Sequence, residues 1–360
     1  MPDWNAILKG TLRGPTLRRA HGGLVGASKR KEASDIRPME EAGDASGSKL
    51  RLLPVLRLVS ALLLASLLHA QDLSPRAYLI TPIHSNAVTL SYSFSDGSIN
   101  FNGALPVSDA KGRYSVPIFG YFHSFNFFGR LASAGAVLPY AVGNFHGTSA
   151  AVPQHLYRSG LVDSFYRVSV NLMGGPAMPP REFIKWRQKM LLGMSLNVIA
   201  PTGQYDPTKL INWGANRWAF KPEFGYSQRW GHWIVDGYAG GWFFTTNHEF
   251  WSHNSSYPGT RSQSQKPMAS FEAHLSYDFK PGVWLSLDGN FWVGGRTSVA
   301  GIENPLTKQL NSRLGGTGAI RVAKHQSLKF SYSNGTYVRY GGNYQNVSIG
   351  WQYSWLGKPN

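Results

Sequence analysis

The sequence contains no cysteine. Disulfide bonds, thiolate catalysis and thiolate metal sites are therefore excluded, as is a lipid attached to a cysteine near a signal cleavage point. Charged residues make up only 15% of the chain, against about 25% in soluble domains. Long apolar runs are missing too, since no stretch approaches the ~20 continuous apolar residues of a membrane helix.

What the chain does have is 360 residues, 13% of them aromatic, and 40 glycines. Low charge and many aromatics without a long apolar run indicate apolar residues dispersed in alternation. This pattern is typical of a membrane β-barrel, whose signal is weak in any one segment. The composition therefore favours one large all-β domain over two ordinary domains.

The formal net charge is +17. Residues 1–70 hold 11 Lys or Arg and 6 Asp or Glu, which leaves 25 basic and 13 acidic residues, a net +12, in the remainder. These cations are spread over many segments, and no nucleic-acid fold signature accompanies them. We expect no nucleic-acid partner, but rather a basic barrel surface and interior that favour anionic solutes or lipid headgroups.

The first seventy residues are expected to lie outside the fold. Residues 1–48 are polar, glycine-rich and aperiodic, and indicate a disordered stretch or a misassigned start, with Met39 as the alternative initiator. Residues 49–70 combine a basic flank, the apolar run 58–68 and a final small residue, which predicts a secretory signal cleaved between Ala70 and Gln71. A short membrane anchor is the alternative, although its apolar core is too short to span.

From residue 71 to 360 the dominant pattern has period two, which marks strands with one apolar face. Most of these runs are 10–15 residues long, whereas soluble strands average 5–6 and tilted membrane strands need at least 9–11. The sequence therefore predicts a transmembrane barrel of about twelve antiparallel strands. The predicted strands are 86–95, 114–128, 130–139, 161–174, 189–201, 217–229, 232–246, 267–280, 282–294, 311–323, 326–337 and 345–355. Strand 232–246 is ambiguous, because Ile234, Tyr238 and Trp242 share a face with Asp236.

The connections alternate in length. Long loops are expected at 96–113, 140–160, 202–216, 247–266, 295–310 and 338–344. Tight turns are expected at Gly129, around Gly231, at 280–282 and at 324–325, with one exception at 176–188, where 181–188 has a helical pattern. Outer-membrane barrels have short periplasmic turns and longer outer loops, so the alternation predicts that class.

The last strand carries aromatics on one face, in the series Val347, Ile349, Trp351, Tyr353 and Trp355. A terminal strand of this kind resembles the signal that directs barrel insertion, and we assign that role to Trp351, Tyr353 and Trp355. The alternative is an ordinary edge strand, but a long aromatic edge is an aggregation hazard in a soluble protein.

One segment is distinctive: Pro201-Thr-Gly-Gln-Tyr-Asp-Pro207, followed by Leu210-Ile-Asn212, Gly214, Asn216-Arg217-Trp218 and Lys221-Pro-Glu223. With Tyr238-Ala-Gly240, Trp242-Phe-Phe244 and Asn247, the chain resembles the outer-membrane transporters of the meta-pathway of phenol degradation. The resemblance runs from about 78 to 355. It implies an outer-membrane barrel that passes hydrophobic or aromatic compounds.

No catalytic signature is found: the sequence lacks a Gly-x-Ser-x-Gly elbow, a phosphate loop and a dinucleotide fingerprint. His248 and His253 are five residues apart, whereas a zinc-binding helical pair needs a spacing of four. We therefore expect no cofactor, no metal and no enzyme activity. Catalytic residues meeting on the barrel rim remain the alternative.

Charged side chains on the polar strand faces should point inward, because Arg or Lys facing lipid at mid-bilayer costs about 2–4 kcal/mol. They either neutralise one another or line a solute path. The interior candidates are Arg167, Asn171, Lys221, Glu223, Glu272, His274, Asp278, Asp288, Arg313, Arg321 and Lys329. Twelve strands leave a narrow interior that a loop can plug, and loop 202–216 is the expected gate, or else a plain surface loop. Its candidate residues, with Arg217 directly after it, are Tyr205, Asp206, Asn212, Trp213, Asn216 and Arg217.

These patterns favour a transporter or narrow channel in the outer membrane of a Gram-negative bacterium, passing small hydrophobic or aromatic solutes by passive diffusion. The expected partners are outer-membrane lipids, the barrel-assembly machinery and the solute itself; the oligomeric state stays open. The alternative is a barrel without a pore, acting as a membrane enzyme or a structural protein.

Overall fold

The computed structural model describes residues 74–357 except 105–106, 150–151 and 256. The segment 1–48 and the signal peptide with its cleavage point at Ala70 and Gln71 lie outside the described residues. Across the described part of the chain, no helix has the length and apolar character needed to cross a membrane.

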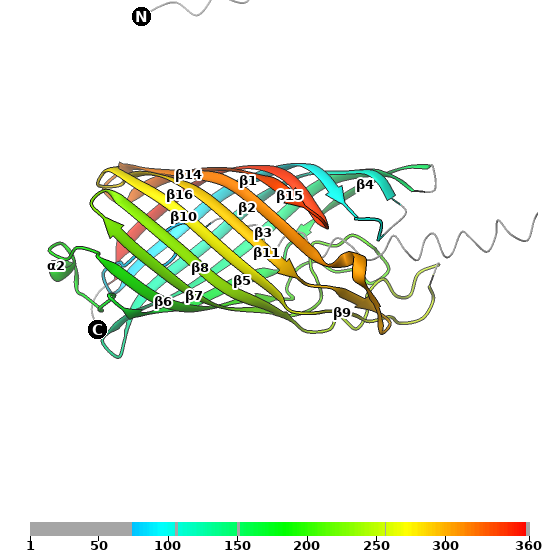
Figure 1. Ribbon diagram of the computed structural model, residues 1–360, viewed down its shortest axis with the longest axis horizontal. Coiled ribbons are helices and arrows are strands. Elements are labelled where there is room, and N and C mark those ends of the chain that lie inside the picture. The colour runs from blue at the N-terminus through cyan, green and yellow to red at the C-terminus, as the bar shows by residue number, and fades with distance from the viewer. Residues whose placement is uncertain (1–73, 105–106, 150–151, 256, 358–360) are drawn as a thin grey trace, which may run out of the picture. The chain divides into compact units, whose positions relative to one another are not determined.

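The described chain forms a closed antiparallel barrel (Figure 1). Its strands are β1 (Ser85–Asn100), β2 (Val107–Phe127), β3 (Arg130–Ser149), β4 (Val152–Leu161), β5 (Ser164–Met173), β6 (Met190–Ala200), β7 (Ala219–Trp230), β8 (Trp233–Phe244), β10 (Met268–Lys280), β11 (Val283–Gly294), β14 (Gln309–Ala323), β15 (Gln326–Val338) and β16 (Gly341–Leu356). Apart from β4 and β5, which both pair with β3, each pairs with its neighbour in chain order; β16 pairs with β1, and the pairing of β2 with β3 completes the ring. β4 and β5 lie one after the other against β3, so the ring has the twelve strand positions expected.

The two ends of the barrel differ. At the turn end, β1 begins, β16 ends, and two-residue turns at 128–129, 231–232, 281–282 and 324–325 join strand pairs. At the loop end lie the connections 201–218, 245–267 and 295–308. The last two carry the short strands β9 (Gln263–Gln265), β12 (Thr297–Val299) and β13 (Ile302–Asn304) with the 3-10 helix η2 (Pro305–Thr307). Figure 1 shows helix α2 (Pro180–Phe183) at the turn end, and β4 and β9 at the loop end. The predicted alternation of tight turns and long connections is confirmed at these positions.

Three predicted loops are wrong. Most of 96–113 and 140–160 is strand, because β1, β2, β3 and β4 continue as paired hairpins, and only 339–340 separates β15 from β16. β2 and β3 have 21 and 20 residues, twice the length that crosses a bilayer. Their extensions carry charges on the outside, as in the exposed ion pair between Arg113 and Asp96, so period-two apolar alternation fades there although the backbone ladder continues.

The expected helix 181–188 is also shorter than predicted. Helix α2 spans Pro180–Phe183, with proline in the first turn. Such a position suits proline because its missing N–H would have no intrahelical partner there.

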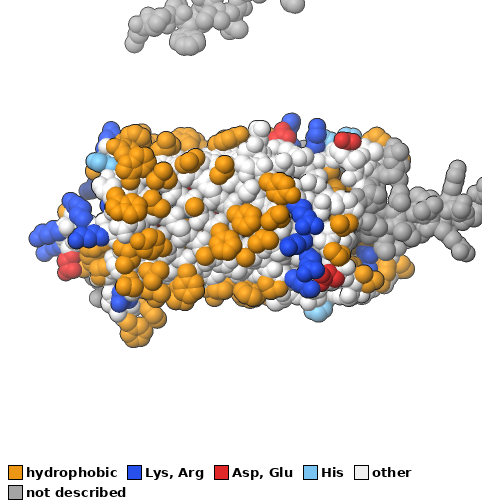
Figure 2. All heavy atoms as spheres, in the orientation of Figure 1, with side chains coloured by type: hydrophobic (Ala, Val, Ile, Leu, Met, Phe, Trp, Pro, Cys, Tyr) orange, Lys and Arg blue, Asp and Glu red, His pale blue; other side chains and the backbone are white. Residues whose placement is uncertain are grey.

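The outside of the barrel is apolar. Leu90, Phe224, Phe271, Leu287 and Phe330 are among the exposed large apolar side chains, and Figure 2 shows apolar side chains spread over the visible barrel wall. On β8 the inward side chains Ile234, Asp236, Tyr238 and Trp242 are all buried, which resolves the ambiguous face. Other side chains cover the inner face of the barrel wall there, so apolar residues of β8 can point inward.

The terminal strand β16 pairs along its full length with β1, from Leu356 opposite Ser85 to Gly341 opposite Asn100. The rings of Trp351, Tyr353 and Trp355 lie in series, with neighbouring centroids 6.3 and 5.9 Å apart. Strand β16 is therefore a closing strand with partners on both sides, and the alternative of an unpaired edge strand is wrong.

Candidate functional site: the barrel interior

Residues 74–84, here called the N-terminal segment, cross the interior just inside the turn end. Arg76 forms an ion pair with Asp278 on β10, at 2.8 Å, and its guanidinium lies 4.3 Å from the centre of the Trp284 ring. The backbone N–H of Arg76 donates to Asp236 on β8. At its other end the segment joins a buried apolar cluster through Ile80. It thus bridges opposite walls of the barrel.

Tyr78 is the best-fixed residue of this segment. Its hydroxyl lies 3.0 Å from Ser195 Oγ and donates to Glu223 Oε1 at 3.1 Å, and its ring packs edge-on against Tyr238. A β-carbon added at Gly193 or Gly225 would come within 2.3 or 2.0 Å of that ring. Only glycine at these two inward positions leaves room for the tyrosine.

A chain of ion pairs crosses the neighbouring wall. Arg167 on β5 lies 3.6 Å from Glu223 on β7, and Lys221 lies 2.6 Å from the same carboxylate and 3.4 Å from Glu272 on β10. Arg167 also donates to the carbonyl of Ala77 at 2.8 Å, so the chain holds the N-terminal segment. Each charge in this chain of ion pairs has an opposite neighbour, which offsets the several kcal/mol that an uncompensated buried charge costs.

The ion pairs continue through His274. Its Nε2 lies 3.6 Å from Glu272, and its Nδ1 lies 2.9 Å from Asp288 on β11. Ser286 and Thr317 both donate to Asp288, at 2.6 Å. Since Ser286 bonds the aspartate rather than the histidine, this group lacks the hydroxyl-to-base contact that an activated nucleophile requires.

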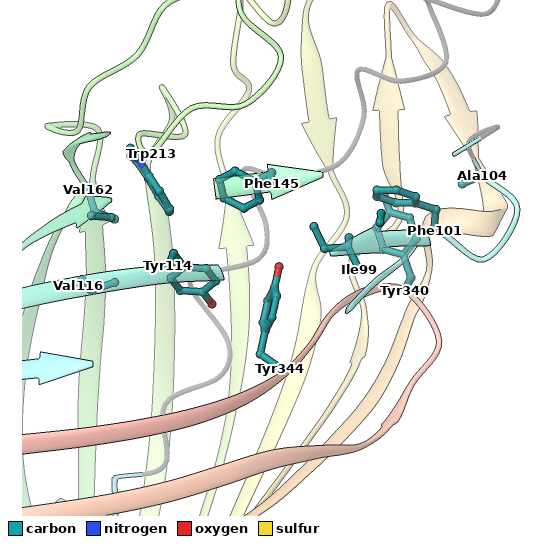
Figure 3. Packing of buried hydrophobic residues seen from close by; sticks show 12 residues of the cluster. Ile99, Phe101, Ala104, Tyr114, Val116, Phe145, Val162, Trp213, Tyr340 and Tyr344 are labelled. Carbon is teal, nitrogen blue, oxygen red and sulfur yellow. The ribbon is translucent and has the colours of Figure 1, made fainter. Parts of the chain in front are cut away.

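The loop end is closed by an apolar group of buried side chains, the loop-end cluster. Its members are Ile99, Phe101, Ala104, Ala110, Tyr114, Val116, Ala141, Phe145, Val162, Trp213, Tyr340 and Tyr344. Figure 3 shows the ring of Trp213 between Val162 and Phe145, above Tyr114. The ring centres of Tyr114 and Phe145 lie 5.9 and 5.8 Å from that of Trp213. Loop 201–218 therefore sends one aromatic side chain into the interior.

A second aromatic group faces it, with Trp242, Trp292 and Phe244 among its members. Arg217 lies over the Phe244 ring at 4.7 Å and donates to Gln265. Within the described residues its Nη1 has no hydrogen-bond partner, and no carboxylate lies within ion-pair distance. Arg217 therefore leaves the aromatic end of the interior positively charged.

Hydrogen bonds to buried polar side chains hold loop 201–218 in place. Asp163, between β4 and β5, accepts the backbone N–H groups of Gly203 and Ala215, at 2.9 and 2.8 Å. Asn247 is fully buried and donates to the Ala215 carbonyl and to the Tyr205 hydroxyl. The loop is thus tied to the barrel rim at both of its ends.

The remaining loop candidates stabilise the loop instead of lining the interior. Tyr205 donates to the Glu249 carbonyl, and Asn216 bonds the side chain of Asn247. Asn212 accepts the N–H of Asp206 and donates to its carbonyl. Hydrogen bonds from Lys209 and Thr208 lower the pKa of Asp206 to about 2.

The other interior candidates differ in burial: some are buried among polar partners, and others are exposed. Asp278 bonds Arg76 and Arg229 near the turn end, Asn171 is buried beside Tyr78, and Arg313 is buried and donates to Ser333. Lys329 faces inward, because it pairs with Ala319 and Gly350 in register with the inward Thr317, yet it is exposed. Arg321, next to a turn, is exposed as well. The wall formed by β14, β15, β16 and β1 is therefore less covered than the wall of the ion pairs.

Sequence reasoning missed Arg76, Tyr78, Asp236, Asp163 and Asn247. Two signals were present. Asp236 lies on the apolar face of its strand. A carboxylate at such a position needs a partner, which indicates a cation or donor from elsewhere in the chain. Gly193 and Gly225 are small residues at inward positions of adjacent strands, which marks a place where another group approaches closely.

Comparisons with known proteins agree with this architecture. The sequence profile of the family described as "Putative MetA-pathway of phenol degradation" matches residues 89–357. No curated protein matches the sequence. Among solved structures, the COG4313 outer membrane channel from Pseudomonas putida F1 is similar with a TM-score of 0.65 and 18% identity, over 79% of this chain and 100% of that one. The β domain of the Bordetella autotransporter BrkA is similar with a TM-score of 0.46 and 12% identity, over 75% and 100%.

The profile covers most of the barrel, including the loop and strand motifs between 201 and 247. This chain therefore belongs to the phenol-degradation MetA-pathway family.

Proposed function

We propose that this protein is an outer-membrane channel through which small hydrophobic or aromatic compounds diffuse passively. The apolar exterior suits a bilayer, and barrels of this class place short turns toward the periplasm and long loops outward. The turn end would then be periplasmic and the loop end external. The family membership and the similarity to an outer membrane channel support the proposal.

The observation that carries the solute class is the aromatic lining of the loop end. Tyr114, Phe145 and Trp213 on one side, and Trp242 and Trp292 on the other, are all buried in the interior. Aromatic side chains offer apolar faces and favourable stacking geometry to a ring-bearing solute. A sugar gains less from such a lining, because its hydroxyl groups would lose water without finding hydrogen-bond partners.

We infer that the route continues along the less covered wall. Ser331 and Ser348, hydrogen-bonded to each other at 2.6 Å, face inward there with Lys329 and Gln352. In this structure the N-terminal segment crosses the turn end and the loop-end cluster packs at the loop end, so we infer that passage requires both to move. Diffusion through such a route follows the solute gradient.

The proposal is tested in liposomes that contain the purified barrel, by uptake of phenol, benzoate and a sugar of similar size. Intact protein should favour the two aromatic solutes. Deletion of residues 204–214, which removes Trp213 and its loop, should raise uptake of all three and weaken the preference for the aromatic ones. Unchanged rates would show that the loop is neither gate nor filter. If neither form passes any solute, the barrel without a pore is the better description.

A further inference from the structure

Four basic residues follow the rim of the barrel at the loop end, and they are called the basic row here. Lys266 precedes β10, Arg296 follows β11, Lys308 precedes β14 and Arg339 follows β15. These are four successive strands of the barrel. The backbone ties neighbouring members together, since the N–H of Lys266 donates to the carbonyl of Arg296 at 2.8 Å. The row therefore lies at one height on the wall.

The row faces outward. Gln309, Thr297 and Val338, each next to a member of the row, are buried, and side chains of successive strand residues point to opposite faces. Figure 2 shows Lys and Arg side chains gathered across the visible face, on the side of the apolar surface that lies toward the loops. Below the row in the same strands, Phe291, Leu314 and Tyr337 are exposed and apolar.

The charge of the row is only partly balanced. Glu303, on β13, forms ion pairs with Lys266 and with Arg296, the latter at 2.8 Å. Within the described residues, Lys308 and Arg339 form no ion pair with a carboxylate. Glu303 thus fixes two of the cations in place and leaves the row with a net charge of +3.

Lipid phosphates lie at the level where an apolar wall ends and charged residues begin. Each Lys or Arg near an anionic lipid surface contributes about 1 kcal/mol, and arginine also binds phosphate through paired hydrogen bonds. Adjacent strands are about 4.8 Å apart, so the four positions span roughly 15 Å, and the two arginines, which are two strands apart, lie roughly 10 Å from each other. That length suits a disaccharide with a phosphate at each end better than a glycerolipid with a single phosphate.

We propose that the basic row binds the phosphorylated disaccharide of lipid A, the anchor of lipopolysaccharide in the outer leaflet. Arg296 and Arg339 hold the two phosphates, and Lys308 lies between them. Glu303 keeps Arg296 extended toward the lipid. This site is separate from the transport route, and it requires only that the loop end faces the outer leaflet.

The test compares two triple variants of the purified mature barrel in detergent, by native mass spectrometry with added lipids. Arg296→Gln/Lys308→Gln/Arg339→Gln removes three charges from the row. Arg181→Gln/Lys185→Gln/Arg187→Gln removes three from the turn end, around α2. Heat-modifiable gel mobility checks that both are folded. Affinity for bisphosphorylated lipid A should fall by about 100-fold in the first variant, at about fivefold per cation, and by less than about threefold in the second.

The wild-type barrel supplies a second measurement, which stands even if the first variant does not fold. Bisphosphorylated lipid A should bind more tightly than monophosphorylated lipid A, phosphatidylglycerol or inorganic phosphate. Equal losses in the two triple variants would overturn the proposal, because the effect would then be one of net charge. Equal binding of lipid A and phosphatidylglycerol would overturn it too, since the row would then be a general anionic-lipid contact.

Discussion

The two ends of this barrel's interior are filled by groups that are held in different physical ways. At the turn end, the N-terminal segment is held by ion pairs, backbone hydrogen bonds and one tyrosine between two glycines. At the loop end, the closure is a packed apolar cluster around Trp213. Hydrogen bonds in a protein contribute a net 0.5–1.5 kcal/mol or so each, because water offers replacements. Apolar burial has no such replacement.

At the turn end, therefore, water can replace the hydrogen bonds and ion pairs that hold the N-terminal segment. When the segment leaves, Arg76, Glu223 and Asp278 can all be hydrated. When Trp213 leaves, its aromatic neighbours are exposed to water unless an apolar solute covers them. The loop end would then respond to the nature of the solute, and the turn end to the strength of its own contacts.

The largest effect is expected from Tyr78→Ala, which removes the ring from its glycine cradle together with its hydrogen bonds. Truncation of a buried aromatic costs about 3–5 kcal/mol, so the displaced segment should be populated at least ~100-fold more often. The chain has no cysteine, so an inward Ser276→Cys reporter can be labelled selectively. Its modification rate should rise accordingly. Tyr332→Ala, at an outward and half-exposed tyrosine, is the matched control. A rate that is the same in both variants would mean that Tyr78 does not hold the segment.

A smaller effect is expected from Trp213→Ala at the loop end. Labelling of an Ala141→Cys reporter in the loop-end cluster should rise roughly tenfold, less than at the turn end because the remaining rings relax into the space. In the same variant, the reporter at the turn end should not change. If it does, the two closures are coupled and do not act separately.

The anchoring of loop 201–218 gives a third, more modest expectation. Asp163→Asn weakens two charge-assisted hydrogen bonds to the loop backbone, each of which contributes about 1.5–3 kcal/mol, although the amide oxygen can still accept one. Tryptic cleavage after Lys209 should speed up about fivefold. Asp206→Asn, which removes the exposed ion pair with Lys209 and weakens the exposed hydrogen bonds from Thr208, is the control and should change the rate less than twofold. The reverse order would place the anchor at Asp206.

The smallest effect concerns pH. The pKa of Asp206 is lowered to about 2 by hydrogen bonds from Lys209 and Thr208. A carboxylate whose pKa is lowered in the folded state stabilises the folded loop at pH values above 3.8, the pKa of the carboxylate in the unfolded chain. That contribution is lost as the pH falls toward 2. Hydrogen exchange of the Thr208 amide, corrected for its intrinsic rate, should stay constant from pH 7 to about 4 and accelerate only below. Acceleration already at pH 5 would contradict this role.

The sequence was a good guide to the barrel wall and a poor one to what fills it. Period two, strand length and the alternation of turns and loops predicted strands such as Met268–Lys280 and Val283–Gly294 to within a residue or so. The same rule placed the charges of Lys221, Glu223 and Glu272 inside. It failed where β2 and β3 run beyond the apolar zone, because there the alternation has no lipid to impose it.

By itself, the sequence determined which face of most strands meets lipid, since the cost of a misplaced charge is local and follows from residue type. Only the tertiary structure decided that Tyr78 lies against Ser195 and Glu223, that Asp163 holds residues 203 and 215, and that Trp213 enters the interior while Tyr205 does not. Those contacts join residues between 40 and 145 positions apart. They exist because the ring closes and brings distant side chains into one small interior, where each buried polar atom needs a partner that no local pattern records.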